Sequence, residues 1–357
     1  MERLVLALNP GGTSTKFGVY REGEPLFEES VRHLPEELAA LGPTMNQTVP
    51  RRDLVLAALA EKGFDMSGLA AVVGRGGTFK PLQAGTYRVN RKLLDDITDG
   101  STLQADHPSN LGAPLAWAVA EPLGLPSYFV DPVCVDEMID EARPSGHPLL
   151  PRKSLSHALN IRMVAYKAAS ELGRPLSDLN MVVLHLGSGV SVNAIRKGRM
   201  IDTNNANDGG PFSSQRTGSL PVTGLVDLCF GGGYEKKQLQ RMFLKEGGLM
   251  AYLGIDHVGE AFTRASKGDA EADRVLRAMV YQFVKEGGAM AAALRGEVDC
   301  VVITGGMAHN GWVVEEITKG LSFLGRVMTF PGEAELEALV RGVLRVLDGI
   351  EEVRTYN

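Results

Sequence analysis

Hydrophobic positions near the start of the chain form two apolar runs around a polar, glycine-rich segment. Residues 4–8 (LVLAL) are continuously apolar, which is typical of a strand buried on both faces. Residues 9–16 (NPGGTSTK) combine glycines, hydroxyl groups and a lysine, and a second strand follows up to Tyr20. This pattern predicts a strand–turn–strand hairpin.

The tip of this predicted hairpin has the chemistry of a phosphate site. Glycines let backbone N–H groups approach an anion, hydroxyl groups donate to its oxygens, and lysine adds positive charge. The tip is not a Walker A loop, because the chain contains no G-x-x-x-x-G-K-[ST]. An ordinary hairpin with a polar tip is the alternative interpretation.

The same pattern recurs at residues 180–195 (NMVVLHLGSGVSVNAI), where His185 ends an apolar run before a second glycine-rich turn. A third strand is predicted at residues 200–202. This repeat indicates two similar domains that each contain one hairpin. Two such hairpins facing each other would hold a polyphosphate from both sides, whereas a chance match of two glycine-rich hairpins is the alternative.

Further periodic segments predict the remaining elements that matter for function. Helices are expected at residues 51–62, 111–120, 154–172, 270–294 and 333–347, and strands at residues 69–73 and 127–130, with a strand, a Gly-Gly pair and a helix at residues 299–309. His157 is expected in the first turn of its helix, beside a cationic stretch at residues 151–153. A structural or capping role is the alternative for this histidine.

Length and composition favour a two-domain globular protein. The chain has 357 residues, of which 44% are hydrophobic and 22% charged. Its net charge of −6 argues against a broad basic surface for nucleic acid, although a local basic pocket stays possible. No run approaches the roughly 18 apolar residues of a membrane span, and the N-terminus does not resemble a signal peptide.

The cysteines agree with a reducing compartment. Cys134, Cys229 and Cys300 lie far apart and form no C-x-x-C pair. We therefore expect three small buried residues and neither a disulfide framework nor a zinc site. Together with the missing membrane span, this pattern predicts a cytoplasmic enzyme.

Several charged side chains stand where a ligand could contact them. Arg75 lies between glycines after a strand, which suits anion binding, with a surface salt bridge as the alternative. Asp131 follows the strand at residues 127–130, where α/β folds place catalytic acids, although a turn aspartate is the competing interpretation. Arg216 lies in a polar loop, and Glu335 near a helix start has a helix-dipole role as its alternative.

In chain order, these motifs resemble the acetate and butyrate kinase family of the actin-like sugar kinase and chaperone ATPase superfamily. The matching segments cover nearly the whole chain: NPGGTSTK at 9–16, GRGG at 74–77, HPSNLG at 107–112, VDPV at 130–133, RPSGHP at 143–148, RKSLSHALN at 152–160, HLGSG at 185–189, RTG at 216–218, TGG at 304–306 and PGE at 331–333.

The resemblance implies an α/β fold with two ribonuclease-H-like (actin-like ATPase) domains and a nucleotide cleft between them. The N-terminal domain would comprise residues 1–152 and a returning helix at residues 334–357. The nucleotide-binding C-terminal domain would comprise residues 153–333. A homodimer or a higher homo-oligomer is also implied.

The resemblance further implies a reaction in which ATP and a short-chain carboxylate give ADP and an acyl phosphate, with Mg²⁺. This agrees with the residues, because phosphoryl transfer needs mainly positioning and positive charge, and a carboxylate is already ionised at pH 7. Butyrate is the preferred substrate, with isobutyrate, acetate and propionate as alternatives. A nucleotide-binding protein with little catalysis is the alternative from another class; it would not require Arg75, His157 and Arg216 together.

By resemblance, individual residues receive roles. Those expected to act in catalysis are Arg75, His107, Asp131, His157 and Arg216. The two arginines would hold the carboxylate and the transferring phosphoryl group, His157 would donate to that group, and His107 would help shape the site. Asp131 would orient an arginine or act through the waters of the metal. Those expected to hold Mg²⁺, through water, are Asn9 and Glu335. Those expected to contact ATP or ADP are Gly12, Thr13, Ser14, Lys16, His185, Gly187, Ser188, Gly189, Asp256, Gly305 and Gly306.

Three departures from the family pattern change these expectations. Gly12 replaces the usual serine, which removes one hydroxyl donor. Residues 255–259 (IDHVG) replace the usual Asp-Ala-Arg beside adenine, so that Asp256 substitutes only after a shift of one residue. Gly76 and Gly77 replace bulky apolar residues, and we expect them to leave space for an acyl chain longer than acetate.

Overall fold

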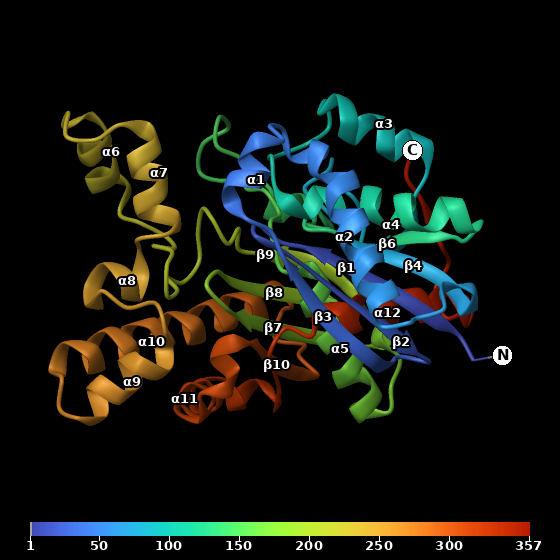
Figure 1. Cartoon of the computed structure of the whole chain (residues 1–357). Helices are drawn as coiled ribbons and strands as arrows, with labels where there is room; N and C mark the ends of the chain where they lie inside the picture. Colours follow the sequence, from blue (N-terminus) through green and yellow to red (C-terminus); the bar gives the residue numbers. More distant parts are fainter. Residues whose placement is uncertain (1) are drawn as a thin grey trace. The chain divides into compact units, whose positions relative to one another are not determined.

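A computed structural model describes residues 2–357 and shows an α/β chain that folds into two compact units (Figure 1). One unit contains the residues up to Asp136 together with Ala334–Asn357, and the other contains Glu137–Glu333. The division therefore falls before the expected one at residue 152. The reason lies in two hydrogen bonds: the Met200 N–H donates to Glu137 Oε2 over 2.9 Å, and the Ile139 N–H donates to the Ile201 carbonyl over 3.0 Å.

The first unit contains a seven-stranded sheet in the order β12-β5-β6-β4-β1-β2-β3. Its strands are β1 (Leu4–Pro10), β2 (Ser14–Arg21), β3 (Glu24–Arg32), β4 (Leu69–Arg75), β5 (Thr86–Arg88), β6 (Ser127–Val130) and β12 (Arg354–Thr355). Its helices are α1 (Pro35–Ala40), α2 (Thr48–Glu61), α3 (Arg91–Asp99), α4 (Gly112–Ala120) and α12 (Glu335–Leu347). The pairs β1–β4 and β4–β6 are parallel, whereas the pairs β1–β2 and β2–β3 are antiparallel.

The second unit contains a five-stranded sheet in the order β11-β10-β7-β8-β9. Its strands are β7 (Asn180–Leu186), β8 (Val190–Arg196), β9 (Arg199–Thr203), β10 (Cys300–Gly305) and β11 (Arg326–Pro331). Its helices are α5 (Ala158–Leu172), α6 (Val222–Phe230), α7 (Lys236–Leu244), α8 (Gly248–Leu253), α9 (Val258–Ser266), α10 (Ala270–Ala293) and α11 (Gly311–Leu321).

The two predicted hairpins are confirmed and occupy equivalent places in their sheets. β1 pairs with β2 so that Asn9 lies opposite Lys16, and β7 pairs with β8 so that His185 lies opposite Ser191. In each sheet the first hairpin strand has a parallel neighbour, β4 or β10. The second hairpin strand has an antiparallel neighbour, β3 or β9. The internal repeat is therefore a repeat of topology.

Burial of both sheet faces explains the apolar runs. Residues 5–8 of β1 are at most 1% exposed. In the second unit, Met279 and Phe283 of the long helix α10 are fully buried in one core with Val182 and Val192 of the sheet. A strand covered on both faces has no position for a polar side chain until it ends, so polar side chains concentrate where these strands meet their turns.

Some predicted helix ends differ from the structure. α5 begins at Ala158 and not at residue 154, because His157 has a non-helical backbone (φ −81°, ψ 55°). The placement of His157 in the first turn was therefore wrong; it directly precedes the helix. α12 begins at Glu335 rather than at residue 333, and α2 begins earlier, at Thr48.

The cysteine prediction is wrong at one of three positions. Cys134 and Cys300 are buried, whereas Cys229 is exposed. Cys229 lies on α6, a largely apolar helix with no buried residue, which Figure 1 shows with α7 away from strands β7–β9. The described helices lack the combination of length and apolar character that crossing a membrane requires.

Candidate active site

The tip of the first hairpin is a turn over Gly11–Ser14 whose carbonyl groups bond inward. Arg51 of α2 donates to the carbonyls of Gly11 (2.9 Å), Gly12 (3.1 Å) and Ser14 (3.1 Å). The backbone N–H groups of Gly12 and Thr13 have no acceptor among residues 2–357, and both residues are exposed. The turn therefore offers two free backbone donors to solvent.

Beside this turn, Asn9, Arg75 and Glu335 form one contact group in the first unit. Arg75 contacts Glu335 Oε1 over 2.5 Å, and the amide nitrogen of Asn9 donates to Glu335 Oε2 over 2.5 Å. Arg75 also donates to Asn9 Oδ1 over 3.3 Å, whereas its buried Nε has no partner in the described chain. The strand ends β1 and β4 and the start of α12 thus place a cation, an amide and a carboxylate together.

His107 is expected to help shape the site, and its environment favours the neutral ring. The Ser109 N–H donates to His107 Nδ1 over 3.2 Å, and the Ser109 hydroxyl lies 2.8 Å from the same nitrogen. Burial, together with the charge of Arg75, lowers the pKa of His107 below its ordinary value, with a smaller opposing effect of Asp106. Since Nδ1 accepts a backbone hydrogen bond, the proton of the neutral ring lies on Nε2.

Asp131 is held rigidly at the end of β6. Its backbone has a φ of 38°, a left-handed conformation that is uncommon outside glycine. The Gly85 N–H donates to Asp131 Oδ1 over 2.7 Å, and the Asp131 N–H donates to the Gly85 carbonyl over 3.0 Å. Backbone strain of this kind is concentrated at functional sites, which supports a role for this aspartate.

In the second unit two histidine rings stack at the start of α5 and the end of β7. The rings of His157 and His185 have centroids 3.9 Å apart and are nearly parallel. His157 Nδ1 lies 2.9 Å from the Ser191 hydroxyl, and His185 Nδ1 lies 2.8 Å from Asn160 Oδ1. Because that amide oxygen only accepts, Nδ1 of His185 carries a proton, and the buried Nε2 of the same ring lies 3.3 Å from Glu333 Oε1.

Arg216 packs directly against the second glycine-rich turn. A Cβ atom at Gly189 would come within 2.5 Å of an Arg216 guanidinium nitrogen, so that this close contact requires glycine. The Arg216 N–H donates to Ser213 Oγ over 3.0 Å, and this hydroxyl donates to the Ser188 carbonyl. Burial lowers the pKa of Arg216, yet arginine stays charged at every physiological pH.

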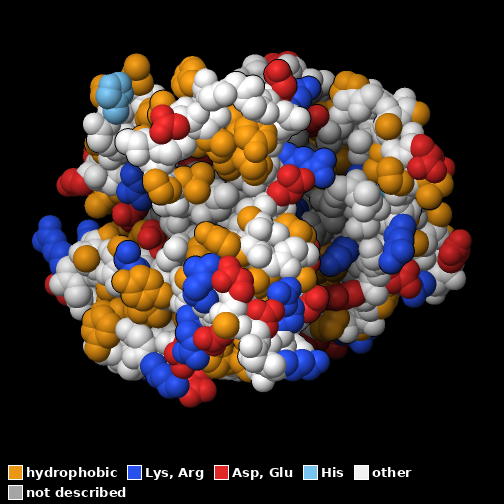
Figure 2. Space-filling model, turned by 90° about the vertical axis from the view of Figure 1, so that its left-hand side faces the viewer, with side chains coloured by type: hydrophobic (Ala, Val, Ile, Leu, Met, Phe, Trp, Pro, Cys, Tyr) orange, Lys and Arg blue, Asp and Glu red, His pale blue; other side chains and the backbone are white. Residues whose placement is uncertain are grey.

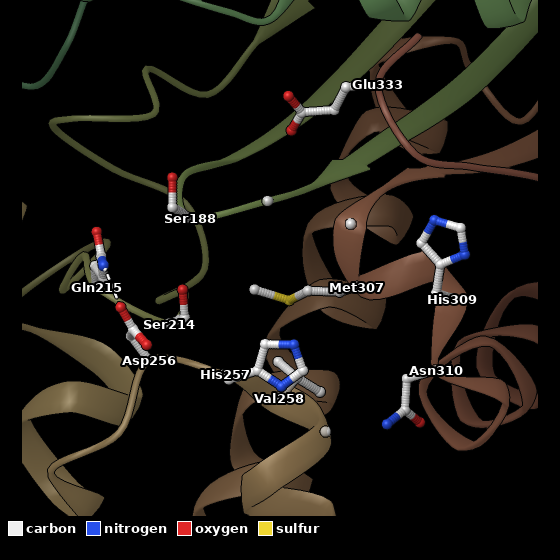
Figure 3. A pocket seen from close by; sticks show the side chains of 13 residues that line it. Ser188, Ser214, Gln215, Asp256, His257, Val258, Met307, His309, Asn310 and Glu333 are labelled. Atoms are coloured by element: carbon white, nitrogen blue, oxygen red, sulfur yellow. Dashed lines mark hydrogen bonds between the residues drawn. The ribbon is translucent and has the colours of Figure 1, made fainter. Parts of the chain in front are cut away.

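A cavity of about 560 Å³ adjoins this turn (Figure 3). It is lined by Gly187, Ser188, Ser214, Gln215, Asp256, His257, Val258, Gly259, Gly306, Met307, His309, Asn310 and Glu333. Figure 3 shows Gln215 and Asp256 on one side, joined by a hydrogen bond of 2.7 Å, and His309 and Asn310 on the other. Its size and mixed polarity suit a nucleoside.

The structure groups the expected residues into two sets, one in each unit. The first unit holds the set Asn9, Gly12, Thr13, Ser14, Lys16, Arg75, His107, Asp131 and Glu335. The second unit holds the set His157, His185, Gly187, Ser188, Gly189, Arg216, Asp256, Gly305 and Gly306. Gly305 has a φ of 90° and lies against the Leu186 backbone, so only glycine fits there.

Sequence reasoning missed several residues at these sites, among them Arg51, Asn160, Gln215 and His309. Asn160 could have been found, because it lies within the matching segment at residues 152–160. Arg51 had no such signal, since it follows a proline at the start of an ordinary helical pattern.

The expectation that Gly76 and Gly77 leave space for a longer acyl chain is wrong. A Cβ at Gly76 would lie 2.4 Å from the side chain of Pro132, and one at Gly77 would lie 2.3 Å from Asn110 Oδ1. Both absent side chains would point into packed protein. These glycines therefore permit close packing behind Arg75 and provide no argument about the substrate.

The residues expected to hold Mg²⁺ fit an ion bound through water. Asn9 and Glu335 supply the hard oxygen atoms that Mg²⁺ prefers. Both Glu335 oxygens already have partners, Arg75 and Asn9, which disfavours direct ligation. No group of three or more His, Cys, Asp or Glu side chains that could hold a metal occurs within residues 2–357.

Comparison with solved structures shows which fold the chain shares. The chain has a TM-score of 0.76 with acetate kinase of Porphyromonas gingivalis at 19% identity, covering 96% of this chain and 99% of that one. It has a TM-score of 0.75 with a propionate kinase of Francisella tularensis at 18% identity, covering 94% and 98%. The protein therefore has the two-domain fold of actin-like ATPases.

Comparison of sequences identifies the family. The acetokinase family matches residues 149–334. Butyrate kinase 2 of Clostridium acetobutylicum is 44% identical over the full length of both chains, and a probable butyrate kinase of Clostridium botulinum is 42% identical, also over the full length. The chain belongs to the acetokinase family and is a carboxylate kinase.

Proposed function

We propose that this chain transfers the γ-phosphoryl group of ATP to butyrate, giving butanoyl phosphate and ADP. The observation that supports it most is the full-length identity of 44% to a butyrate kinase. The geometry is consistent with it, because Arg75, His157 and Arg216 all lie at turns or strand ends that a ligand can approach. Since Gly76 and Gly77 carry no information on chain length, the preference for butyrate over isobutyrate, propionate or acetate rests on the relatives alone.

In the proposed mechanism a carboxylate oxygen of the substrate attacks the γ-phosphorus directly. One P–O bond forms, the bond to the β-phosphate oxygen breaks, and the electron pair leaves with ADP. No proton has to be removed from the ionised nucleophile, which explains why His107 can be neutral. Arg75 and Arg216 stabilise the charge of the transferring group, and His157 donates to its oxygens.

The remaining residues position the nucleotide and its ion. The free N–H groups of the Gly11–Ser14 turn, with Lys16, bind phosphate oxygens, while the cavity beside Gly306 and Asp256 holds the nucleoside. Asn9 and Glu335 would hold Mg²⁺ through water, and the ion would neutralise phosphate charge. Asp131 orients a charged partner of the same site. That both hairpins act on one nucleotide stays a prediction.

An acyl hydroxamate assay with ATP and Mg²⁺ tests the proposal. Acetate, propionate, butyrate and isobutyrate are compared by kcat/KM, and butyrate is expected to rank first. A different ranking would reassign the substrate. ATP binding without any carboxylate-dependent turnover would instead support a nucleotide-binding protein with little catalysis.

Replacement of Arg216 tests the assigned chemistry. Arg216→Ala should lower kcat by about 10²–10³-fold, because it removes a preorganised charge from the transition state. Arg274→Ala is the matched control, since Arg274 is an exposed arginine of the same unit that pairs with Glu271. Near-normal turnover of the Arg216 variant would refute its role.

We also propose that the protein is a cytoplasmic homodimer or higher oligomer. α6 supports this proposal, because Val222 and Phe230 are 72% and 86% exposed. Figure 2 shows hydrophobic side chains gathered at several places on one face of the molecule. Light scattering of Phe230→Glu against the wild type tests whether α6 belongs to the interface; an unchanged mass would exclude it.

A further inference from the structure

Arg51 is a fully buried cation that serves the backbone of one turn. The residue is 1% exposed, although arginine is almost never buried without an ionic partner. Its guanidinium donates to three carbonyls of the Gly11–Ser14 turn, to Thr15 Oγ1 over 3.1 Å and to Gln47 Oε1 over 2.8 Å. All of these acceptors are neutral, and no carboxylate forms an ion pair with Arg51 among residues 2–357.

These bonds orient the peptide groups of the turn, so that its carbonyl oxygens face the protein. The carbonyls of Gly11, Gly12 and Ser14 accept from Arg51, and the Thr13 carbonyl accepts from the His33 N–H over 2.9 Å. Every carbonyl of the turn therefore has a donor within the protein. The N–H groups of Gly12 and Thr13 are the backbone groups left for an outside partner, and they can only bind an acceptor.

The surroundings give Arg51 neutral hydrogen-bond acceptors but no anion among residues 2–357. Desolvation of a cation is costly unless an anion or several hydrogen bonds offset it. The one titratable neighbour that contacts the same hydroxyl is His33, whose Nε2 lies 2.8 Å from Thr15 Oγ1. Burial and the charge of Arg51 lower the pKa of His33 to about 4, so this ring is neutral near pH 7 and adds no second charge.

We propose that Arg51 is a positioning residue for the nucleotide phosphates: it holds the turn carbonyls inward, aims the N–H groups of Gly12 and Thr13 outward, and provides the positive charge that bound phosphate compensates. The inference rests on the proposed function, since it takes the anion at this turn to be ATP. Arg51 touches no substrate, and its effect passes through the turn.

The competing explanation is that Arg51 only stabilises the structure of the turn, as a tether. The two explanations differ in whether the positive charge of Arg51 is needed. A tether requires hydrogen-bond donors only, whereas the proposal requires a cation as well. Arg51→Met removes both, and Arg51→Lys keeps the charge with fewer donors. Arg52→Met is the matched control, because the neighbouring Arg52 is partly exposed and pairs with Asp53.

The experiment measures ATP binding by calorimetry without carboxylate, at low and high salt, beside the melting temperature of each variant. We expect Arg51→Met to weaken ATP binding by about tenfold or more, which corresponds to about 1.4 kcal/mol. Arg51→Lys should weaken ATP binding less than Arg51→Met does, and Arg52→Met should bind ATP as tightly as the wild type. In turnover, KM for ATP should rise while KM for the carboxylate stays within about twofold.

Three results would overturn the inference: folded Arg51→Met that binds ATP as tightly as the wild type, equal losses in the Met and Lys variants, or equal rises in both KM values. If Arg51→Met does not fold, Gln47→Met replaces it, because Gln47 holds the guanidinium by two bonds and its removal keeps the charge. We then expect ATP binding about two- to threefold weaker; unchanged binding refutes the proposal. A wild type that binds ATP without turnover contradicts only the proposed function.

Discussion

Gly12 is a position where a hydroxyl group can be added to the phosphate-binding turn. A Cβ there would meet no atom within 4 Å, and the backbone is not left-handed. Gly12→Ser should therefore lower KM for ATP by about two- to tenfold, since one hydrogen bond contributes about 0.5–1.5 kcal/mol net. Gly12→Ala is the matched control and should leave KM unchanged. A higher KM in the serine variant would show that the turn does not bind phosphate at this position.

His33 should make stability depend on pH. Its folded pKa of about 4 lies below the ordinary 6.5, so between these values the unfolded chain binds a proton that the folded chain does not. The free energy of unfolding should fall by roughly 2–3 kcal/mol as the pH drops through this window, and the contribution is complete above it. Urea titrations at several pH values measure this, and His33→Gln should flatten the dependence.

Carboxylates also titrate over this pH range. Comparing the pH dependence of the free energy of unfolding in the wild type and in His33→Gln controls for them, because both proteins contain the same carboxylates. His147→Gln is the second control, because His147 is exposed. Equal slopes in the wild type and the His33 variant would contradict the assignment.

At the scale of residues, the sequence indicated the charged side chains of the candidate site, but it did not indicate the residues that position the backbone around them. Arg75 stands between two glycines, and Arg216 lies in a polar loop two residues before Gly218, which are visible patterns. Arg51 acts from a distant helix on main-chain atoms, and nothing in its neighbours indicates that. The expectation for Gly76 and Gly77 was wrong for a related reason. The sequence shows that a side chain is missing, but it does not show whether that side chain would point toward the ligand or into packed protein.

At the scale of elements, the paired glycines of α10 allow a sharp test. A Cβ at Gly288 would meet nothing within 4 Å, whereas one at Gly287 would lie 2.7 Å from Leu321 Cδ1, a fully buried side chain. Gly288→Ala should raise the free energy of unfolding by about 0.5–1 kcal/mol through helix propensity. Gly287→Ala should stabilise less or destabilise, because overpacking costs about 1–3 kcal/mol.

Thermal or urea unfolding of the two alanine variants measures this difference. Equal stabilisation by both would show that the contact between α10 and α11 relaxes freely.

Most strands of the two cores were predictable from apolar runs, but β3, the order of strands in each sheet and several helix ends were not. His157 ends the extended segment before α5, although its surroundings read as a continuous helix. Its side chain bonds to Ser191 on a different element, and such a long-range contact overrides local preference. A tertiary contact therefore decided the position of a candidate catalytic residue.

At the scale of the whole molecule, the second unit is continuous in sequence and has its own core. Residues 137–333 should therefore fold as an isolated fragment and bind ADP, because the cavity lies entirely within them. The fragment should lack kinase activity, since Arg75 and Glu335 belong to the other unit. Circular dichroism melting and calorimetry check both statements.

A shorter fragment, residues 153–333, is the control for the boundary. It lacks the bonds of Glu137 and Ile139 to β9, so a lower melting temperature is expected. A fragment of residues 137–333 that does not fold would contradict the independence of this unit.

The duplication was visible in the sequence because both hairpins keep the same apolar and glycine pattern. The boundary at residue 137 was not, since residues 137–152 contain little regular structure and are assigned by contacts with β9. The local sequence pattern thus predicted that there are two domains, whereas long-range contacts determine at which residue the boundary lies.

The position of Glu335 in the chain has a consequence for biosynthesis. Its partners Asn9 and Arg75 leave the ribosome early, but all of residues 137–333 must be translated before Glu335 emerges. At about 5–20 residues per second, the nascent first unit waits some ten seconds or more with Arg75 lacking its carboxylate. The second unit has left the ribosome in full before α12 and β12 of the first unit emerge. The half of the enzyme whose synthesis begins first is therefore the half that is completed last.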